Sequence, residues 1–290
     1  MANSLRQVRQ RINSTKSTAQ ITKAMYMVSQ SKVKKAEKTY KSYMDFMQRI
    51  ASMVSELLDN ETDDIHPLLK PREVKKTAYF IISSDRGLAG SYNSSLFKAF
   101  DEKIKESHND NNEIITAAVG KQGFAYLKRK NYPLLQDHAT YVRDDVMFID
   151  IVPLAKKFVD LYLAGEIDKL VIVYNHYINS LTQEVRFEEL LPIKKVDGQK
   201  SNIDYIYETG IEKTLNIILP MYVEDIIYGI ILDAKTSEHS ARMNSMKNAT
   251  DNAEEVIDKL ELLYNRARQA VVTNELIDII GGANAIGGDK

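Results

Sequence analysis

A seven-residue repeat near the start of the chain decides the fold: residues 5–33 read LRQVRQRINSTKSTAQITKAMYMVSQSKV. Steps of three and four residues from Leu5 reach Leu57 without meeting a charged side chain. Such a row is typical of a coiled-coil seam, in which apolar residues recur about every 3.5 residues. Residues 1–66 also contain neither proline nor glycine. This arm therefore predicts one long helix that pairs with another.

The C-terminal part of the chain supplies a second helix of this kind. Residues 221–280 contain no proline and only one glycine, and small residues recur in ARMNSMKNATDNA (241–253). The predicted seam is Ile230, Ala234, Ser237, Ala241, Ser245, Ala249, Ala253, Val256, Leu260, Leu263, Ala267, Ala270, Asn274 and Ile277. Its run of four-residue steps between 237 and 253 predicts a locally unwound supercoil with closely packed helices.

The two arms carry opposite charge. Residues 1–60 hold eleven Lys and Arg against four Asp and Glu, a net of +7, whereas residues 221–290 hold seven against twelve, a net of −5. Opposite flanking charges favour pairing of the two arms. We therefore expect a long antiparallel two-helix coiled coil, formed by helices within 1–66 and 211–290.

The middle of the chain, 67–210, predicts a Rossmann-like α/β domain. Apolar, β-rich runs alternate with helical patterns, which favours a mostly parallel sheet. The predicted strands are 76–83, 112–120, 138–142, 168–178 and 182–193, the last of them antiparallel. The predicted helices are 93–106, 122–129 and 147–163.

Motifs for catalysis are missing from the sequence. The loop SDRGLAGSYN (84–93) stands where phosphates bind in such sheets, but its G-x-x-G spacing favours a tight turn. The five histidines show no metal-ligand spacing, and no G-x-S-x-G motif occurs. We therefore expect no catalytic residues, no cofactor and no metal, and a function that depends on shape and contact.

Composition and charge indicate the cellular compartment and the class of partner. Cysteine is absent, which suits a reducing compartment, and the net charge is −1. The basic N-terminal stretch has no apolar core of a secretory signal, and no apolar run reaches the length of a membrane span. The basic run SKVKKAEK (31–38) favours an acidic protein partner over nucleic acid or lipid.

Four stretches are informative in combination: ITKAMYMVSQSKVKKAE (21–37), ISSDRGLAGSYN (82–93), SEHSARMNSMKNATDNA (237–253) and LYNRARQAVVTNELIDIIGGANAI (263–286). Together they resemble the γ subunit of the rotary (F-type) ATP synthase. The resemblance implies a non-catalytic central rotor shaft that couples rotation of a c-ring to conformational change in three catalytic β subunits. It implies one copy per complex, with three α and three β subunits around the coiled coil, and the ε subunit and c-ring at the α/β domain.

The resemblance also implies contacts for particular residues. The positions matching contacts with β subunits are Lys23, Met25, Lys32, Lys34, Lys35, Arg268 and Gln269, and those matching the foot at the c-ring and ε are Tyr205 and Glu208. Because nothing resembles the cysteine-bearing insert of plastid members, a bacterial type is expected. The expected location is the cytoplasmic face of the bacterial cell membrane, touched only indirectly through the c-ring.

Two other functions stay open from the residues alone. A coiled-coil adaptor that tethers partners without rotating would tolerate deletion of a heptad, whereas a rotor shaft must keep both ends in register. An enzyme that uses the α/β domain to bind a dinucleotide would bind NAD or ATP as the isolated chain.

Overall fold

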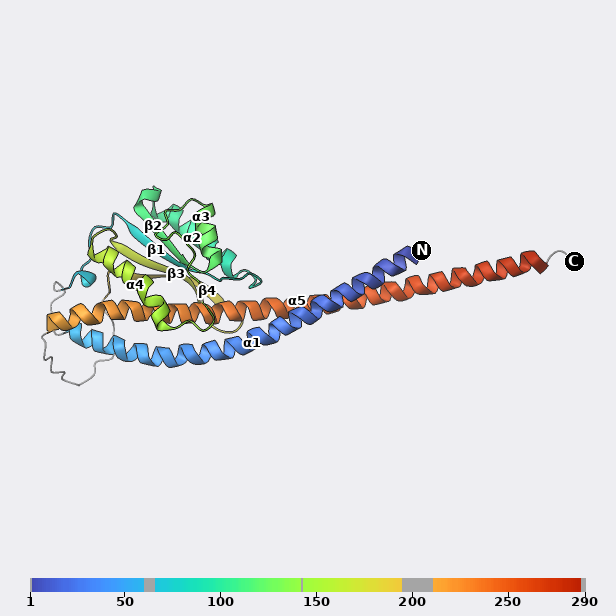
Figure 1. Ribbon diagram of the computed structural model, residues 1–290, viewed down its shortest axis with the longest axis horizontal. Helices are drawn as coiled ribbons and strands as arrows, with labels where there is room; N and C mark the ends of the chain where they lie inside the picture. Colours follow the sequence, from blue (N-terminus) through green and yellow to red (C-terminus); the bar gives the residue numbers. More distant parts are fainter. Residues whose placement is uncertain (1, 60–65, 142, 195–210, 288–290) are drawn as a thin grey trace. The chain divides into compact units, whose positions relative to one another are not determined.

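The computed structural model describes residues 2–59, 66–141, 143–194 and 211–287 of the chain (Figure 1). Its elements, in chain order, are α1 (Ala2–Asp59), β1 (Thr77–Ile82), α2 (Tyr92–Ser107), β2 (Ile114–Val119), α3 (Lys121–Arg129), α4 (Phe148–Leu163), β3 (Lys169–Tyr177), β4 (Gln183–Leu191) and α5 (Ile211–Gly287). Short 3-10 turns span Pro67–Leu69 and Asn111–Glu113.

Contacts divide the chain into two compact units. One is Ser29–Arg242, and the other combines Met1–Val28 with Met243–Lys290. The long helices α1 and α5 each contribute residues to both units. The division of the chain at residues 66 and 210 stays a prediction.

The helices α1 and α5 pair in antiparallel fashion. In one unit, Lys16 Nζ lies 2.6 Å from Glu261 Oε1. In the other, Tyr43 OH donates a hydrogen bond to Asp225 Oδ1 at 2.9 Å. As residue numbers rise along α1, those of the partners fall along α5, which confirms the predicted antiparallel helix pair.

Burial along α1 confirms its heptad seam. Every buried residue among the described side chains of α1 lies on the predicted row: Ile12, Ala19, Thr22, Ser29, Val33, Met47 and Val54. The buried hydroxyl of Thr22 is satisfied, because Thr250 Oγ1 donates to Thr22 Oγ1 at 2.8 Å. A buried hydroxyl pair of this kind avoids the cost of an unpaired polar group.

The seam of α5 differs from the predicted row. Met246 and Thr250 are buried, whereas their small neighbours Ser245 and Ala249 are only partly so. Thr250 contacts Thr22 of α1, and the buried residues Met246, Thr250 and Ala253 are spaced by steps of four and three. The predicted run of fours, and the local unwinding inferred from it, were therefore wrong between 246 and 253.

The same shift continues toward the C-terminus. Val256 and Leu263, both predicted in the seam, are 44% and 52% exposed. The neighbouring Ile257 and Tyr264 are partly buried instead. Ala253, 8% exposed, was predicted correctly and belongs to the heptad row that these residues continue.

Enlarging Ala253 is expected to strain the helix pair. Ala253→Leu adds methyl groups to a buried seam position, and overpacking of this kind costs about 1–3 kcal/mol of unfolding free energy. Urea denaturation of the chain measures the loss. The matched control is Ala270→Leu, because Ala270 is exposed on the same helix. Equal stability of the two variants would contradict close packing at Ala253.

The sheet of the α/β domain has the order β2-β1-β3-β4. β1 pairs in parallel with β2 and with β3, while β4 is antiparallel to β3, as predicted. The predicted strand 138–142 was wrong: its only ladder contact among the described residues is a bridge between Val119 and Thr140. This segment lies beside β2 without running along it, and Val142 lies outside the described residues.

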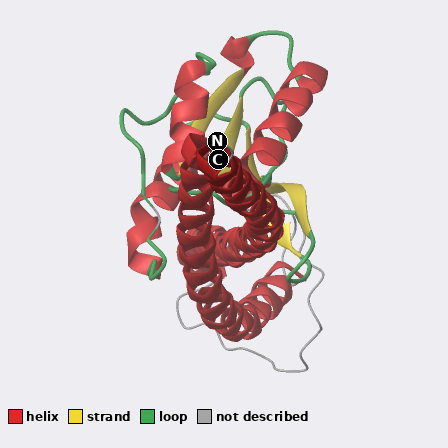
Figure 2. Ribbon diagram, turned by 90° about the vertical axis from the view of Figure 1, so that its right-hand side faces the viewer, coloured by secondary structure: helices red, strands yellow, loops and turns green. Residues whose placement is uncertain are grey.

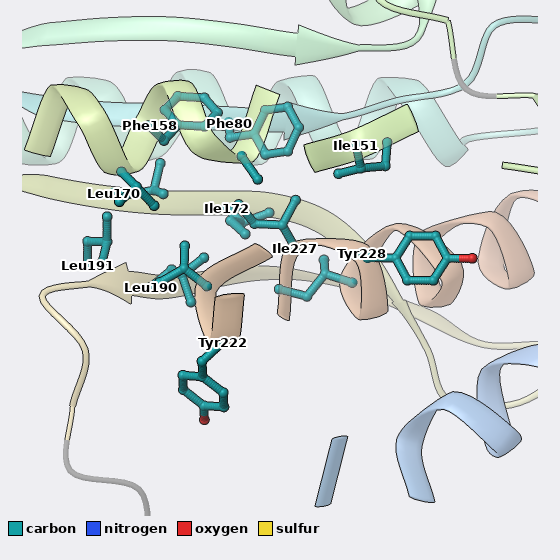
Figure 3. Close-up of a cluster of buried hydrophobic side chains, with 14 of the residues drawn as sticks. Phe80, Ile151, Phe158, Leu170, Ile172, Leu190, Leu191, Tyr222, Ile227 and Tyr228 are labelled. Atoms are coloured by element: carbon teal, nitrogen blue, oxygen red, sulfur yellow. The ribbon is translucent and has the colours of Figure 1, made fainter. Parts of the chain in front are cut away.

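The parallel strands β1, β2 and β3 are buried on both faces, which explains their continuous apolar runs, whereas every second residue in the first part of β4 is exposed. On one face, Tyr79 and Ile81 of β1 pack with buried residues of α2 and α3. On the other, Phe80 packs against Phe158 of α4 with ring centroids 5.2 Å apart, and Ile227 of α5 belongs to the same cluster (Figure 3). Figure 2 shows helices on both sides of the strands.

Helix α5 is continuous through Pro220. Its single early glycine, Gly229, has a packing reason: a Cβ there would lie 3.2 Å from the ring of Tyr43 in α1. By length and composition, Lys213–Gly281 could cross a membrane, but 61% of its apolar window is buried inside the protein. The core helix of a soluble protein has the same property.

Candidate functional site

The crevice at the carboxyl ends of β1 and β3 is the usual ligand position in a sheet of this topology. The chain runs from β1 to β2 on one side and reaches β3 on the other, so the strand order reverses there. The loop 84–93 leaves β1 at this point and opens α2.

In this chain the crevice is occupied by α5. Arg242 Nη2 donates to the carbonyl oxygen of Arg86 at 3.1 Å. Tyr92 OH donates to the carbonyl oxygen of Ala234 at 3.0 Å. All residues from 231 to 240 are buried. The loop therefore uses its carbonyl groups to bind the chain's own helix, and side chains of α5 fill the place where a ligand would enter.

An acidic side chain of α5 caps the end of β3. Asp233 Oδ2 lies 2.5 Å from His176 Nδ1, and Asp233 Oδ1 accepts from the backbone N–H of Tyr177 at 2.9 Å. Burial raises the pKa of the Asp233 carboxyl, although both contacts act in the opposite direction. The side chain is 3% exposed, so its contacts are confined to the protein interior.

Two buried ion pairs follow within the next three turns of α5. Lys235 Nζ lies 3.0 Å from Glu238 Oε2, and Arg242 Nη2 lies 2.8 Å from Glu238 Oε1. Burial opposes ionisation of Glu238, but the two cations outweigh it and lower the pKa of the carboxyl. A buried carboxylate with two cationic partners is thereby kept ionised.

His239 lies beside this cluster and contacts the segment before α4. Its Nε2 is 3.4 Å from Asp144 Oδ1, and Asp144 Oδ2 is 2.5 Å from Lys32 Nζ of α1. Burial lowers the pKa of His239 to about 4, with Glu238 and Asp144 raising it and the nearby cations lowering it further. The imidazole is therefore neutral at physiological pH.

This pKa shift predicts a loss of stability in mild acid. The unfolded chain protonates His239 near its ordinary pKa, whereas the folded chain resists until about 4. The contribution of neutral His239 to the free energy of unfolding is complete above about pH 6.5. It is lost as the pH falls toward 4, which lowers the free energy of unfolding by about 2–3 kcal/mol. Unfolding free energies at pH 7.5 and pH 4.5 measure it. We expect a smaller difference for His239→Gln than for the parent chain, and no such reduction for the exposed control His138→Gln.

The predicted contact residues of α1 lie in two groups. Lys34 and Lys35 are exposed, and Lys32 is partly buried because it pairs with Asp144. Lys32 and Lys35 line a hollow of about 220 Å³ together with Asp144 and His239. In the other unit, Lys23 is exposed and Met25 is partly buried.

The predicted contact residues of α5, Arg268 and Gln269, are both exposed. Beyond them lies an apolar surface that the sequence reading missed: Val272, Leu276, Ile277, Ile279 and Ile280 are each between 48% and 67% exposed. Ile277 had been placed in the intrachain seam. The seam prediction was wrong at this position, because Ile277 is 59% exposed.

The predicted foot residues Tyr205 and Glu208 lie outside the described residues. Among the residues that are described, no cluster of three or more His, Asp or Glu is placed to hold a metal ion.

Comparison with known proteins identifies a family over nearly the whole chain. A family model described as ATP synthase matches residues 4–286. Among solved structures, the mitochondrial ATP synthase central stalk and c-ring of Tetrahymena thermophila is similar, with 26% identity, a TM-score of 0.62, and coverage of 79% of this chain and 99% of that chain.

Two structures from Euglena gracilis share the fold. A chain of its mitochondrial ATP synthase OSCP/F1/c-ring assembly in rotational state 3 has 20% identity and a TM-score of 0.68, covering 100% of this chain and 97% of that one. A chain of the rotor in rotational state 1 has 17% identity and a TM-score of 0.66, covering 94% and 100%.

Proposed function

Because the chain belongs to the γ-subunit family of the F-type ATP synthases, we propose that it turns, one copy per complex, inside a ring of three α and three β subunits. Family membership makes it the rotor shaft and a non-catalytic subunit, since the catalytic sites lie in the β subunits. The match across residues 4–286 carries this conclusion, because it includes both long helices and the α/β domain.

The proposal extends to the partners at the other end of the rotor. The similar Tetrahymena chain comes from a structure of a central stalk and c-ring, and one of the Euglena chains comes from an assembly of OSCP, F1 and c-ring. We assign the same partners to this chain, together with an ε subunit, and place the complex at the cytoplasmic face of a bacterial cell membrane. The chain touches that membrane only through the c-ring, which proton flow turns.

Particular residues are assigned to these contacts. The exposed Lys34 and Lys35, with Lys32 beside them, present positive charge to an acidic region of β. Complementary charge of this kind steers and orients partners. The other proposed β contacts are Lys23, Met25, Arg268 and Gln269, and the proposed foot at the c-ring and ε is formed by Tyr205 and Glu208.

Direct observation of rotation tests the function. The chain has no cysteine, so Lys103→Cys on the exposed face of α2 creates one thiol for a probe. With the surrounding ring immobilised and ATP supplied, we expect the probe to turn in one direction, with as many pauses per turn as there are β subunits.

The alternatives give different results in this experiment. A coiled-coil adaptor would hold the probe still, or let it fluctuate without direction, whether or not ATP is present. A dinucleotide-binding enzyme would show no rotation and would bind NAD or ATP as the isolated chain. Either result overturns the rotor proposal.

A further inference from the structure

We propose that four residues, Tyr92, Asp233, Ser240 and Arg242, form a joint that passes torque from the α/β domain to the shaft helices. This set is called the crevice clamp below. The inference rests on the proposed rotor function, in which the c-ring turns the α/β domain and the helices carry that turn to the β subunits. It assigns these residues a positioning role within the chain.

The clamp contacts reach several parts of the domain. Asp233 holds the end of β3 through His176 and the N–H of Tyr177. Ser240 Oγ donates to the carbonyl oxygen of Ser180, in the turn between β3 and β4, at 2.7 Å. These contacts fix α5 to one side of the crevice.

On the other side, the contacts reach the loop after β1 and the start of α2. Arg242 donates to the carbonyl oxygens of Arg86 at 3.1 Å and Gly87 at 3.4 Å. Tyr92 donates to Ala234, and its own carbonyl accepts from the amide of Asn175 in β3 at 3.0 Å. Helix α5 is therefore bonded on two sides within about three turns.

The chemistry of these contacts suits resistance to twisting. Apolar packing joins α5 to the sheet along 215–234, but hydrophobic attraction is non-directional and permits sliding. Hydrogen bonds to backbone carbonyls have narrow preferences of distance and angle. Polar contacts placed where α5 leaves the Ser29–Arg242 unit therefore set its angle about its own axis.

Helix α1 is held by the same region. Asp144 bridges His239 of α5 and Lys32 of α1, and Tyr177 OH donates to Glu37 of α1. The segment that receives the clamp thus connects both helices of the pair to the domain.

Burial separates this role from partner binding. Asp233 and Ser240 are both buried, so subunits around the shaft cannot contact them. Buried ion pairs such as those beside the clamp seldom stabilise a fold more than apolar packing of similar volume would. Their contribution here is a defined geometry between helix and domain.

A measurement of torsional stiffness tests the joint. The variant Tyr92→Phe/Ser240→Ala/Arg242→Gln removes the bonds to Ala234, Ser180 and the loop after β1. Its matched control is Tyr79→Phe/Ser94→Ala/Arg72→Gln, which removes a buried tyrosine bond, a serine bond and an arginine bound to carbonyls, all within the domain and none to α5.

Both variants are assembled into the complete complex with the probe at Lys103→Cys. The angular variance of the probe is recorded during a nucleotide-held pause, with the ring immobilised. We expect the clamp variant to raise this variance about twofold over the parent and the control to leave it unchanged. Equal variance in the clamp variant and the control overturns the inference.

Failure of the rotor proposal would be seen separately, because the parent complex itself would then not rotate. If the triple variant does not assemble, Tyr92→Phe is compared with Tyr79→Phe, since each loses one hydroxyl and keeps its ring. A larger variance for Tyr92→Phe supports the joint, and equal variances contradict it.

Discussion

Glu238→Leu is expected to lower the free energy of unfolding by about 3–5 kcal/mol, because it leaves a buried ammonium without its partner. The side chain of Lys235 is 9% exposed, and its ion pair is the 3.0 Å contact with Glu238. Glu238 is 4% exposed, so a leucine in its place is buried and does not open the site to water. Urea denaturation of the chain measures the difference.

The double variant Lys235→Met/Glu238→Leu separates charge burial from the loss of a contact. With both ends of the pair apolar, no uncompensated ammonium remains, and buried ion pairs replaced in this way often lose little stability. Arg242, the second cation at Glu238, is 12% exposed and keeps its bonds to the carbonyl oxygens of Arg86 and Gly87. We expect the double variant to recover most of the loss. A double variant as unstable as Glu238→Leu would show that the cost comes from steric misfit instead.

Gly120→Ala is expected to destabilise the α/β domain by more than about 2 kcal/mol. Gly120 follows β2 with a φ of +91°, a conformation that side chains rarely permit. A Cβ there would also lie 2.3 Å from the carbonyl oxygen of Ser83, which is backbone and cannot rotate away. The ends of β1 and β2 would have to separate.

Gly87→Ala is the matched control for this substitution. Gly87 lies at the same edge of the sheet, and a Cβ on it would meet no atom within 4 Å. We therefore expect its thermal unfolding temperature to stay close to that of the parent chain. A similar fall in both variants would contradict the steric reason given for Gly120.

The long N-terminal helix was predictable because one signal repeats many times. The predicted row matches the burial of α1 wherever its side chains are described, from Leu5 to residue 56, and its small polar members Thr22 and Ser29 are buried as the repeat requires. The strand pattern of β1 and β3 was similarly clear, since buried parallel strands read as apolar runs.

The face of α5 that packs against α1 was harder to predict, because neighbouring residues are equally suited to the seam. Val256 and Ile257 are both apolar and β-branched, so composition does not decide which of them faces α1. The sequence pattern predicts Ser245 in the seam, although the longer side chain of the neighbouring Met246 is the buried one. Packing against α1 decides which of the two residues is buried, and the local sequence of α5 carries no information about the surface of α1.

The crevice clamp was missed for a different reason. Asp233 and Arg242 look like solvated helix residues in the sequence, since charged side chains are almost never fully buried unless paired. Apart from the ion pair between Arg242 and Glu238, their partners are backbone groups and side chains more than 50 residues away, such as His176 and Arg86. Only the folded topology brings these groups together at one edge of the sheet.

The composition of the native complex tests the rotor assignment most directly. The chain would be tagged and purified from its host's membranes in mild detergent, and the native mass and subunit ratio would be measured. The assignment predicts one copy of this 33.0 kDa chain with three copies each of two larger chains. A symmetric homo-oligomer, or equal numbers of this chain and one partner, would contradict it.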